Sequence, residues 1–197
     1  KSLRIDGTLR VLQESGLPIS RNQVSEAYEE CSKVQWDLQA LEKDCSFEDQ
    51  VAIFLRHIRP DLYTQIGQAV RHRLTEQYAN PFLSHPPKLV KGARQVLETL
   101  RRKNYLVGLI SNTGMTPGSM VRDYFHELGI FDYFASLVFS DEVGLSKPAP
   151  LIFDHALKEL NVNASDTVHV GDNLRSDVMG AKRAGLRAVW IDGYDSR

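Results

Sequence analysis

The chain has 197 residues and nearly balanced charge, with 24 Lys and Arg against 25 Asp and Glu. This balance gives no reason to expect nucleic acid or an anionic membrane as a partner, and it favours a small molecule. No apolar run is long enough to cross a membrane, and the first residues lack a signal-peptide pattern. We therefore expect a cytoplasmic protein in which Cys31 and Cys45 are reduced thiols.

Residues 1–15 contain the sequence IDGTL, which has two interpretations. In the first, Asp6 is the N-cap of a helix over Gly7–Ser15 that Gly16 ends. In the second, residues 1–9 form a strand with Asp6 near its end. Charged and apolar residues alternate in KSLRI, whereas a parallel strand buried on both faces is nearly continuously apolar. We therefore favour the helix.

The pattern of residues 17–80 predicts helices only. Ser20 is placed to cap a long amphipathic helix, and Ser46 is placed to cap a second one. A third helix follows, and the connections between the helices are short. Three or four helices of this kind form a small bundle, in which aromatic side chains such as Trp36 and Phe47 are expected to lie in the core.

A proline-containing linker, residues 80–88, separates these helices from a region in which helix and strand patterns alternate. The expected strands are Tyr105–Ile110, Leu137–Phe139, Thr167–Val170 and Ala188–Ile191. This alternation predicts an α/β fold with a Rossmann-like parallel sheet and helices on both faces. We therefore divide the chain into a helical domain, residues 1–82, and an α/β domain, residues 83–197.

Two aspartates follow the expected strand Thr167–Val170, within the sequence GDNLRSD. Taken alone, Asp172 and Asp177 are most simply a turn aspartate and an acid favoured at a helix N-terminus. The alternative is a ligand site. Open α/β sheets bind ligands at the carboxyl ends of their parallel strands, and carboxylate oxygens suit a hard cation such as Mg²⁺.

Ser111 and Asn112 end another expected strand and lead into a turn, residues 113–118, before a helix. A hydroxyl and exposed backbone N–H groups near a helix N-terminus can hold a phosphoryl oxygen. A polar strand end with a local turn explains these residues equally well. Lys147 precedes Pro148, which favours an extended backbone. Most single lysines are solvated surface charges, but in a water-poor pocket this one would stabilise negative charge.

Considered together, three segments resemble motifs two, three and four of the haloacid dehalogenase (HAD) superfamily. They are GLISN at residues 108–112, GLSKPAP at residues 144–150 and GDNLRSD at residues 171–177. The order of elements from about Pro87 onward is similar to the core of phosphatase-like members. The preceding helices resemble the helical C1-type cap that many members carry between motifs one and two, which closes over the active site.

The resemblance also implies a role for each site residue. Ser111 would bind the transferring phosphoryl group, assisted by the backbone N–H of Asn112. Lys147 would offset the charge of the nucleophile and the phosphoryl group. Asp172 would coordinate Mg²⁺, and Asp177 would ligate it through water or orient the other ligands.

Motif one of the superfamily supplies the nucleophilic aspartate on the central strand, and its match in this chain is incomplete. IDGTL would place Asp6 at the general acid/base position and Arg4 at the nucleophile position, and an arginine cannot attack phosphorus. Either residues 1–9 form the central strand and catalysis is lost, or a strand before Lys1 carries the nucleophile. We favour the second alternative.

These expectations indicate a Mg²⁺-dependent phosphatase acting on a small phosphorylated metabolite through an aspartyl-phosphate intermediate. The alternatives are a catalytically silent binding or scaffold protein of the same fold and, less favoured, a 2-haloacid dehalogenase, since dehalogenases generally lack the acid at Asp172. We expect none of the six histidines to cluster with the acids, and we expect His169 to be a core histidine. The sequence names neither the substrate nor the oligomeric state.

Overall fold

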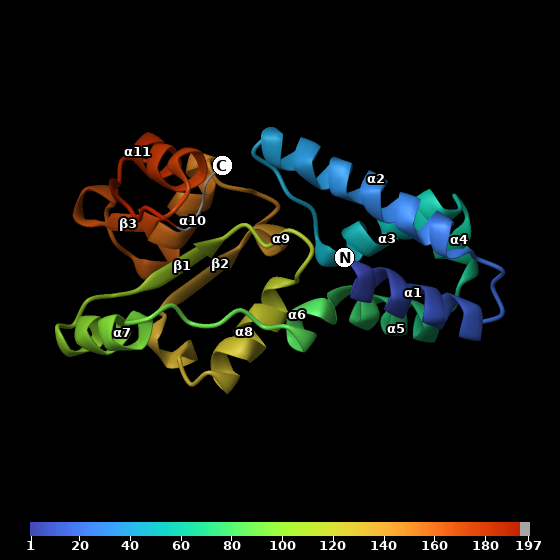
Figure 1. The fold of residues 1–197 in the computed structure, drawn as a ribbon. Coiled ribbons are helices and arrows are strands. Elements are labelled where there is room, and N and C mark those ends of the chain that lie inside the picture. Colours follow the sequence, from blue (N-terminus) through green and yellow to red (C-terminus); the bar gives the residue numbers. More distant parts are fainter. Residues whose placement is uncertain (194–197) are drawn as a thin grey trace.

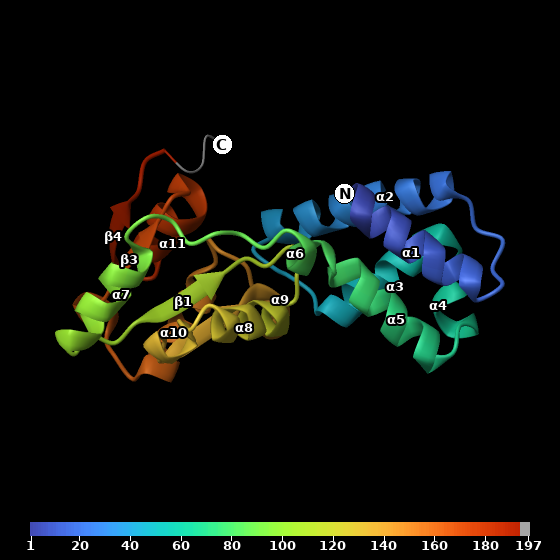
Figure 2. The same ribbon diagram turned by 60° about the horizontal axis from the view of Figure 1, so that its bottom comes forward.

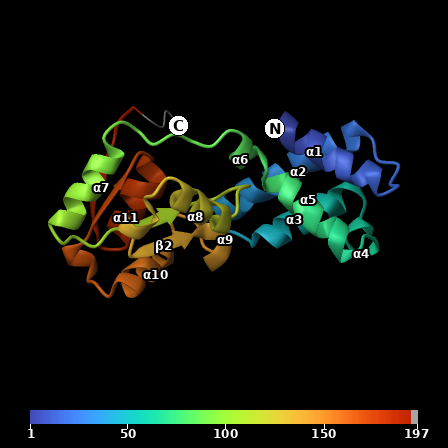
Figure 3. The same cartoon turned by 90° about the horizontal axis from the view of Figure 1, so that it is seen from below.

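The computed structural model describes residues 1–193, so residues 194–197 of the expected α/β domain lie outside the described part. Helices form one half of the molecule, and an α/β arrangement forms the other (Figure 1). The helical half contains α1 (Ser2–Glu14), α2 (Arg21–Ala40), α3 (Phe47–Ile58), α4 (Leu62–Gln65) and α5 (Gln68–Ala79). Figure 3 shows this half and the α/β half at opposite ends of the molecule. No helix within residues 1–193 combines the length and apolar character needed to span a bilayer.

Helix α6 (Pro81–Ser84) lies between the two halves in Figure 2, and the α/β half follows it. The helices of the α/β half are α7 (Ala93–Arg102), α8 (Gly118–Glu127), α9 (Ser140–Val143), α10 (Pro150–Leu160) and α11 (Gly180–Arg183). Its strands are β1 (Gly108–Ser111), β2 (Ser136–Phe139), β3 (Val168–Gly171) and β4 (Arg187–Trp190). Short helical turns complete it, namely η1 (Phe131–Tyr133), η2 (Ala164–Asp166) and η3 (Leu174–Met179).

Local capping signals fix the starts of two helices in the helical half, as predicted. The backbone N–H of Gln23 donates to the Ser20 hydroxyl, and the Gln23 side chain accepts from the Ser20 backbone at 3.0 Å, which completes a capping box at the start of α2. The Ser46 hydroxyl accepts from the backbone N–H of Asp49 at 3.1 Å and caps α3. The helix type and both start positions are therefore confirmed.

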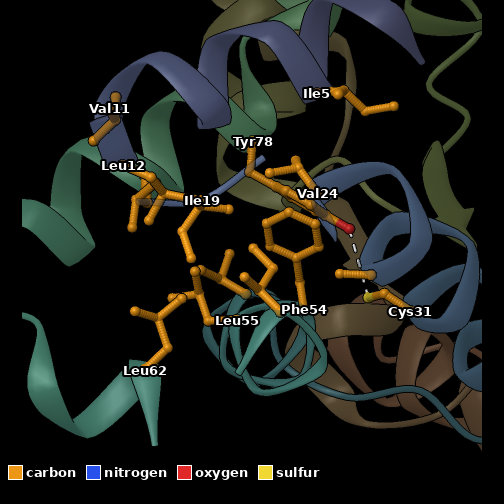
Figure 4. Packing of buried hydrophobic residues seen from close by; sticks show 14 of the residues in the cluster. Ile5, Val11, Leu12, Ile19, Val24, Cys31, Phe54, Leu55, Leu62 and Tyr78 are labelled. Atoms are coloured by element: carbon orange, nitrogen blue, oxygen red, sulfur yellow. Dashed lines mark hydrogen bonds between the residues drawn. The ribbon is translucent and has the colours of Figure 1, made fainter. Parts of the chain in front are cut away.

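The helical half encloses a dense apolar core (Figure 4). Tyr78 of α5 lies at its centre, next to Phe54 of α3, with ring centroids 5.0 Å apart. Its hydroxyl donates to the Cys31 sulfur at 3.5 Å, so both buried polar atoms have a partner. Phe47 is buried as expected, but the expectation for Trp36 is wrong, because its side chain is 63% exposed on α2. Cys31 and Cys45 are free thiols.

The IDGTL segment lies inside α1, so both interpretations of it need correction. The helix begins at Ser2, and Asp6 sits in its interior, where it accepts a hydrogen bond from the Ser2 hydroxyl at 2.9 Å. Asp6 is therefore not an N-cap, and residues 1–9 are not a strand. Ile5 and Leu12 are buried on one helix face with Thr8 between them. Burial of that face against α2 and α5 explains why the helix extends further than the local cap signal predicts.

The α/β half contains two short parallel sheets. β1 pairs with β2, and β3 pairs with β4. The α/β fold and the parallel pairing are as predicted, but within residues 1–193 the expected single sheet is present as two separate pairs. α10 packs against β1 and β2 through Ile152 and Phe153, both fully buried. β1 is also shorter than expected, and Tyr105 and Leu106 before it are exposed.

Candidate active site

Lys147 connects the two sheets. Its ammonium group donates to the backbone carbonyl of Ile110 on β1 at 2.8 Å and to Oδ1 of Asp177, next to β3, at 2.7 Å. Asn112 holds the lysine backbone from the end of β1. Its side-chain oxygen accepts from the Lys147 N–H at 2.8 Å, and its amide donates to the Lys147 carbonyl at 3.0 Å. The structure thus joins the expected motif-two and motif-three segments directly.

Asp177 is a buried carboxylate with a hydrogen-bond partner on each oxygen. Oδ1 faces Lys147 and His169, and Oδ2 accepts from the backbone N–H of Asn173 at 3.0 Å. Burial alone would raise the pKa of Asp177, but the hydrogen bond from His169 and the charge of Lys147 outweigh burial and hold this pKa well below its ordinary value. Asp177 is therefore an anion at every physiological pH.

The Asp177 side chain lies directly over Gly171. A Cβ atom added to Gly171 would come within 2.3 Å of Cγ of Asp177, so no other residue fits at this position without moving the carboxylate. Glycine is therefore required at position 171, because the carboxylate of Asp177 lies directly against the end of β3.

His169 corrects the expectation that no histidine clusters with the acids. Its Nε2 lies 3.0 Å from Oδ1 of Asp177. Its ring packs edge-on against the Phe153 ring, with the ring centroids 5.1 Å apart. The side chain is 14% exposed, so the expectation of a mostly buried histidine holds. The sequence could have predicted the contact between His169 and Asp177. Side chains alternate along a strand, so residues 169 and 171 of β3 lie on the same face. Asp177 covers that face at Gly171.

Asp172 follows β3 directly and differs from Asp177 in its contacts. Its backbone carbonyl accepts from the Trp190 indole at 2.9 Å, and within residues 1–193 its carboxylate makes no hydrogen bond or ion pair. Asn173 then caps η3, a single π-helical turn, by accepting from the N–H groups of Arg175 and Ser176 at 3.0 and 2.8 Å. As predicted, Asn173 therefore holds the turn between the two aspartates.

The donor set at this edge fits part of a magnesium site. Asp172 and Asp177 offer carboxylate oxygens, the ligand type that Mg²⁺ prefers, and the Asp172 carboxylate is available. Within the described residues, no group of three or more His, Cys, Asp or Glu side chains is arranged to hold a metal. The remaining ligands of an octahedral ion would be water, substrate oxygens or a carboxylate from another segment.

The expected anion cradle after β1 differs in detail from the sequence prediction. The first N–H group of α8 is already satisfied, because Oδ2 of Asp141 accepts from the Gly118 N–H at 3.1 Å. The Thr113 N–H donates to the Ser140 hydroxyl at 2.9 Å. Within residues 1–193, the hydroxyl of Ser111 and the N–H of Asn112 make no hydrogen bond. Those two groups are therefore available as donors to an anion.

A parallel α/β domain with Ser111 and Asp172 at its strand ends and a Lys147–Asp177 ion pair next to β3, beside a helical domain, has the architecture of a HAD-fold hydrolase. Residues 5–185 match the family described as haloacid dehalogenase-like hydrolase, so the chain belongs to this family. The predicted family and fold class are confirmed.

Curated relatives carry phosphatase names. A stretch of 104 residues is 43% identical to a glyceraldehyde 3-phosphate phosphatase from Pyrococcus abyssi, and it covers 52% of this chain and 42% of that protein. Pyrimidine 5'-nucleotidase YjjG from Escherichia coli is 32% identical over 163 residues, which are 80% of this chain and 70% of the nucleotidase. The chain thus matches less than half the length of the first of these relatives.

Solved structures agree on the fold. The HAD phosphatase from Thermococcus onnurineus matches with a TM-score of 0.61 at 25% identity, covering 99% of this chain and 79% of that one. A 2-haloacid dehalogenase from Pseudomonas syringae matches with a TM-score of 0.64 at 23% identity, covering 98% of this chain and 83% of that one. The second match shows the fold alone.

Proposed function

We propose that the protein is a Mg²⁺-dependent phosphatase that hydrolyses a small phosphorylated metabolite through an aspartyl-phosphate intermediate. The observation that carries this proposal is the position of Lys147. Its buried ammonium lies between the end of β1 and the anionic Asp177, and Asn112 ties its backbone to the strand that presents Ser111. The phosphatase names of the relatives support a phosphomonoester as the substrate class.

In this proposal, the available donors bind the phosphoryl group. The Ser111 hydroxyl and the Asn112 N–H would donate to its oxygens, and Lys147 would neutralise negative charge as the ester bond breaks. Fixed donors in a water-poor site stabilise a developing charge strongly, because they need no reorganisation during the reaction. The side chain of Lys147 is 12% exposed, so it meets this condition.

Asp172 would coordinate the metal ion, and Asp177 would ligate it through water or orient the other ligands. When bound, Mg²⁺ supplies charge neutralisation and orients a phosphoryl oxygen. The lowered pKa of Asp177 keeps this ligand ionised, and its neighbour Asn173 fixes the direction of its carboxylate. The Asp172 carboxylate, which makes no hydrogen bond or ion pair within residues 1–193, would be the direct protein ligand.

The attacking carboxylate has to come from outside α1. Arg4 and Asp6 lie on this helix, in the helical half, and neither is at a strand end. β1 and β3 each pair with one strand only within residues 1–193, and Lys147 links the Ile110 carbonyl on β1 to Asp177 in η3, the turn that follows β3. Unpaired backbone groups at the centre of a sheet are costly. We propose that a further strand pairs with both and ends in the nucleophilic aspartate.

The chemistry then balances in two steps. A carboxylate oxygen forms a bond to phosphorus while the ester P–O bond breaks, and the departing alcohol takes up a proton from the solvent, which the attacking water gives back in the second step. Water then attacks the acyl phosphate, which releases inorganic phosphate and regenerates the carboxylate. Both steps use only the substrate, water and the proposed aspartate.

The test is turnover of p-nitrophenyl phosphate by the full-length protein. We expect activity to be lost in EDTA and restored by added Mg²⁺. Protein quenched in acid during turnover should carry a phosphoryl group that hydroxylamine removes. Turnover that chelation leaves unchanged contradicts the metal requirement, and turnover without the labile phosphoryl group contradicts the intermediate.

A catalytically silent phosphate-binding protein is the second candidate. It is favoured by the described residues themselves, which contain neither a strand-end nucleophile nor a group of three metal-binding side chains. This protein would bind inorganic phosphate through Ser111, Asn112 and Lys147 and release no product. Binding without turnover in the assay above would support it.

A further inference from the structure

Buried charges mark the contact between the two halves of the molecule. The charged side chains buried within residues 1–193 are Arg4, Asp44, Asp141 and Asp177. A buried charge costs free energy unless it is paired, so its location needs an explanation. Asp177 belongs to the site above. The other three converge on the β1–α8 loop, residues 112–117, and two of them come from the helical half.

The connection between α2 and α3 reaches across to the α/β half, beside α9 (Figure 1). Lys43 and Leu145 form an antiparallel bridge there, immediately before the Lys147 segment. The Asp44 N–H donates to the Gly144 carbonyl at 3.2 Å, and the Glu42 carbonyl accepts from the backbone of the same segment. This connection is therefore held to the α/β half by its backbone.

The Asp44 side chain makes a second contact with the α/β half, through the hydroxyl group of Ser140. The Ser140 hydroxyl donates to Oδ2 of Asp44 at 2.5 Å and accepts from the Thr113 N–H at 2.9 Å. A serine has a single hydroxyl proton, and a carboxylate only accepts. Ionised Asp44 thus takes that proton and leaves the oxygen lone pairs for Thr113. Asp44, in the helical half, thus fixes the orientation of the hydroxyl group that accepts from the β1–α8 loop.

Two further contacts hold the same loop. Asp141 accepts from the Thr113 hydroxyl at 2.9 Å. From the helical half, Arg4 donates to the Met115 carbonyl at 3.0 Å and to the Tyr78 carbonyl, and its guanidinium lies 5.0 Å from the Tyr78 ring centroid. Arg4, at the position that the sequence aligned with a nucleophile, therefore ties α1 and α5 to this loop.

We propose that Asp44 is a positioning residue, which acts through Ser140 to hold the β1–α8 loop so that the donors of Ser111 and Asn112 face the phosphoryl group. The inference rests on the proposed function for its kinetic consequence. Its structural consequence, an ordered loop, is independent of activity. The helical half thereby helps to shape the anion site without contacting the substrate through this residue.

Stability considerations also support this assignment. Burial raises the pKa of Asp44, and the charge of Asp141 adds to the effect, although the Ser140 hydrogen bond opposes it. Ionised Asp44 therefore costs folding free energy at neutral pH. A carboxylate whose ionisation opposes folding, yet which accepts from the hydroxyl that holds Thr113, is better explained by positioning than by stability.

The test compares Asp44→Asn with Asp37→Asn in the full-length protein. Asp44 accepts two donors, the Cys45 N–H on Oδ1 at 2.8 Å and the Ser140 hydroxyl on Oδ2. An asparagine has one oxygen and an NH₂ group, so it loses one of the two hydrogen bonds at nearly constant volume. Asp37 is an exposed carboxylate on α2 and is the matched control. Ser140→Ala breaks the same link from the α/β side if Asp44→Asn does not fold.

Three measurements decide the proposal, namely amide hydrogen exchange of residues 112–118, the thermal unfolding midpoint, and kcat and KM for p-nitrophenyl phosphate. For Asp44→Asn we expect exchange in this segment to be about tenfold faster, an unchanged or higher midpoint, and kcat/KM reduced about tenfold. Asp37→Asn should match wild type.

Unchanged exchange in residues 112–118 overturns the proposal, whatever the kinetics. Faster exchange throughout the protein with a lower midpoint also overturns it, because that pattern belongs to a merely structural residue. If the wild type has no turnover at all, the proposed phosphatase function fails. The exchange data then still decide whether Asp44 orders the loop.

Discussion

The two halves of the molecule differ in how completely they bury their apolar surface. In the helical half, Leu12, Leu55 and Leu62 are fully buried around Tyr78, and every main helix contributes to the cluster. In the α/β half, Val168 and Val170 of β3 are about half exposed, although parallel sheets are normally covered on both faces. The helical half thus completes its own core. In the α/β half, which contains the candidate site, the strands within residues 1–193 form two separate pairs, between which we propose a further strand.

The largest expected effect concerns the residue that joins the two sheets. Lys147→Met should lower kcat/KM for a phosphomonoester by about 1,000-fold, because it removes the cation that would neutralise the phosphoryl group. It should also destabilise the protein by about 3 kcal/mol, because it leaves Asp177 buried with less compensation. Steady-state kinetics and urea unfolding measure the two effects. Lys158→Met, on the exposed side of α10, is the control and should change neither.

The second prediction compares an apolar side chain from each half. Leu55→Ala should cost about 3 kcal/mol, because it opens a cavity in a closed core. Val170→Ala, at a side chain 51% exposed, should cost less than about 0.5 kcal/mol in the 197-residue chain. In a protein that also contains the proposed strand, this cost should rise to about 1–2 kcal/mol. Urea unfolding of both forms measures the difference. Equal costs for Val170→Ala in the two forms would contradict a strand that completes this sheet.

The same difference explains how far the sequence could predict the structure. The starts of α2 and α3 were predictable because Ser20 and Ser46 cap them through neighbours three residues away. Long-range pairing was not predictable in this way. Asp44 and Ser140 are 96 positions apart, and no periodicity or cap signal connects them.

In the site, the motif segments were found because each combines polar residues with a strand end. Lys147 and Asn112 were among them, and they contact one another in the structure. His169 was missed, because a histidine inside a strand looks like a core residue until the position of Asp177 over Gly171 is known. The start of α1 was missed because tertiary burial of Ile5, and not a local cap, determines it.

The third prediction uses the buried carboxylates whose pKa values shift in opposite directions. The pKa of Asp177 is lowered, so Asp177 stabilises the fold fully above its ordinary pKa of about 3.9 and loses this contribution as pH falls through its folded pKa. The pKa of Asp44 is raised by burial. Its stabilising contribution is therefore present below about pH 3.9 and is lost as pH rises through the raised pKa.

Urea unfolding between about pH 7 and pH 2 separates the contributions of Asp177 and Asp44 to the free energy of unfolding. Asp177→Asn should remove on the order of 2 kcal/mol of the stability that wild type loses on acidification. Asp44→Asn should keep or raise stability at neutral pH and leave the loss below about pH 4 in place. If both variants reduce the acid-induced loss of unfolding free energy by the same amount, the two carboxylates do not have the opposite roles that their contacts indicate.

The smallest effects concern the asparagine and serine that start a helix in each half. Ser20→Ala and Asn173→Ala should each cost about 1 kcal/mol, because each leaves first-turn N–H groups without their side-chain acceptor. Only Asn173→Ala should also reduce kcat/KM, since the Asn173 backbone N–H holds Oδ2 of Asp177 and a looser turn would misalign that carboxylate. Thermal unfolding and kinetics on the two variants give the comparison. A similar loss of activity for Ser20→Ala would mean that the start of α2 is coupled to the site, and that the two halves are less separate than their cores indicate.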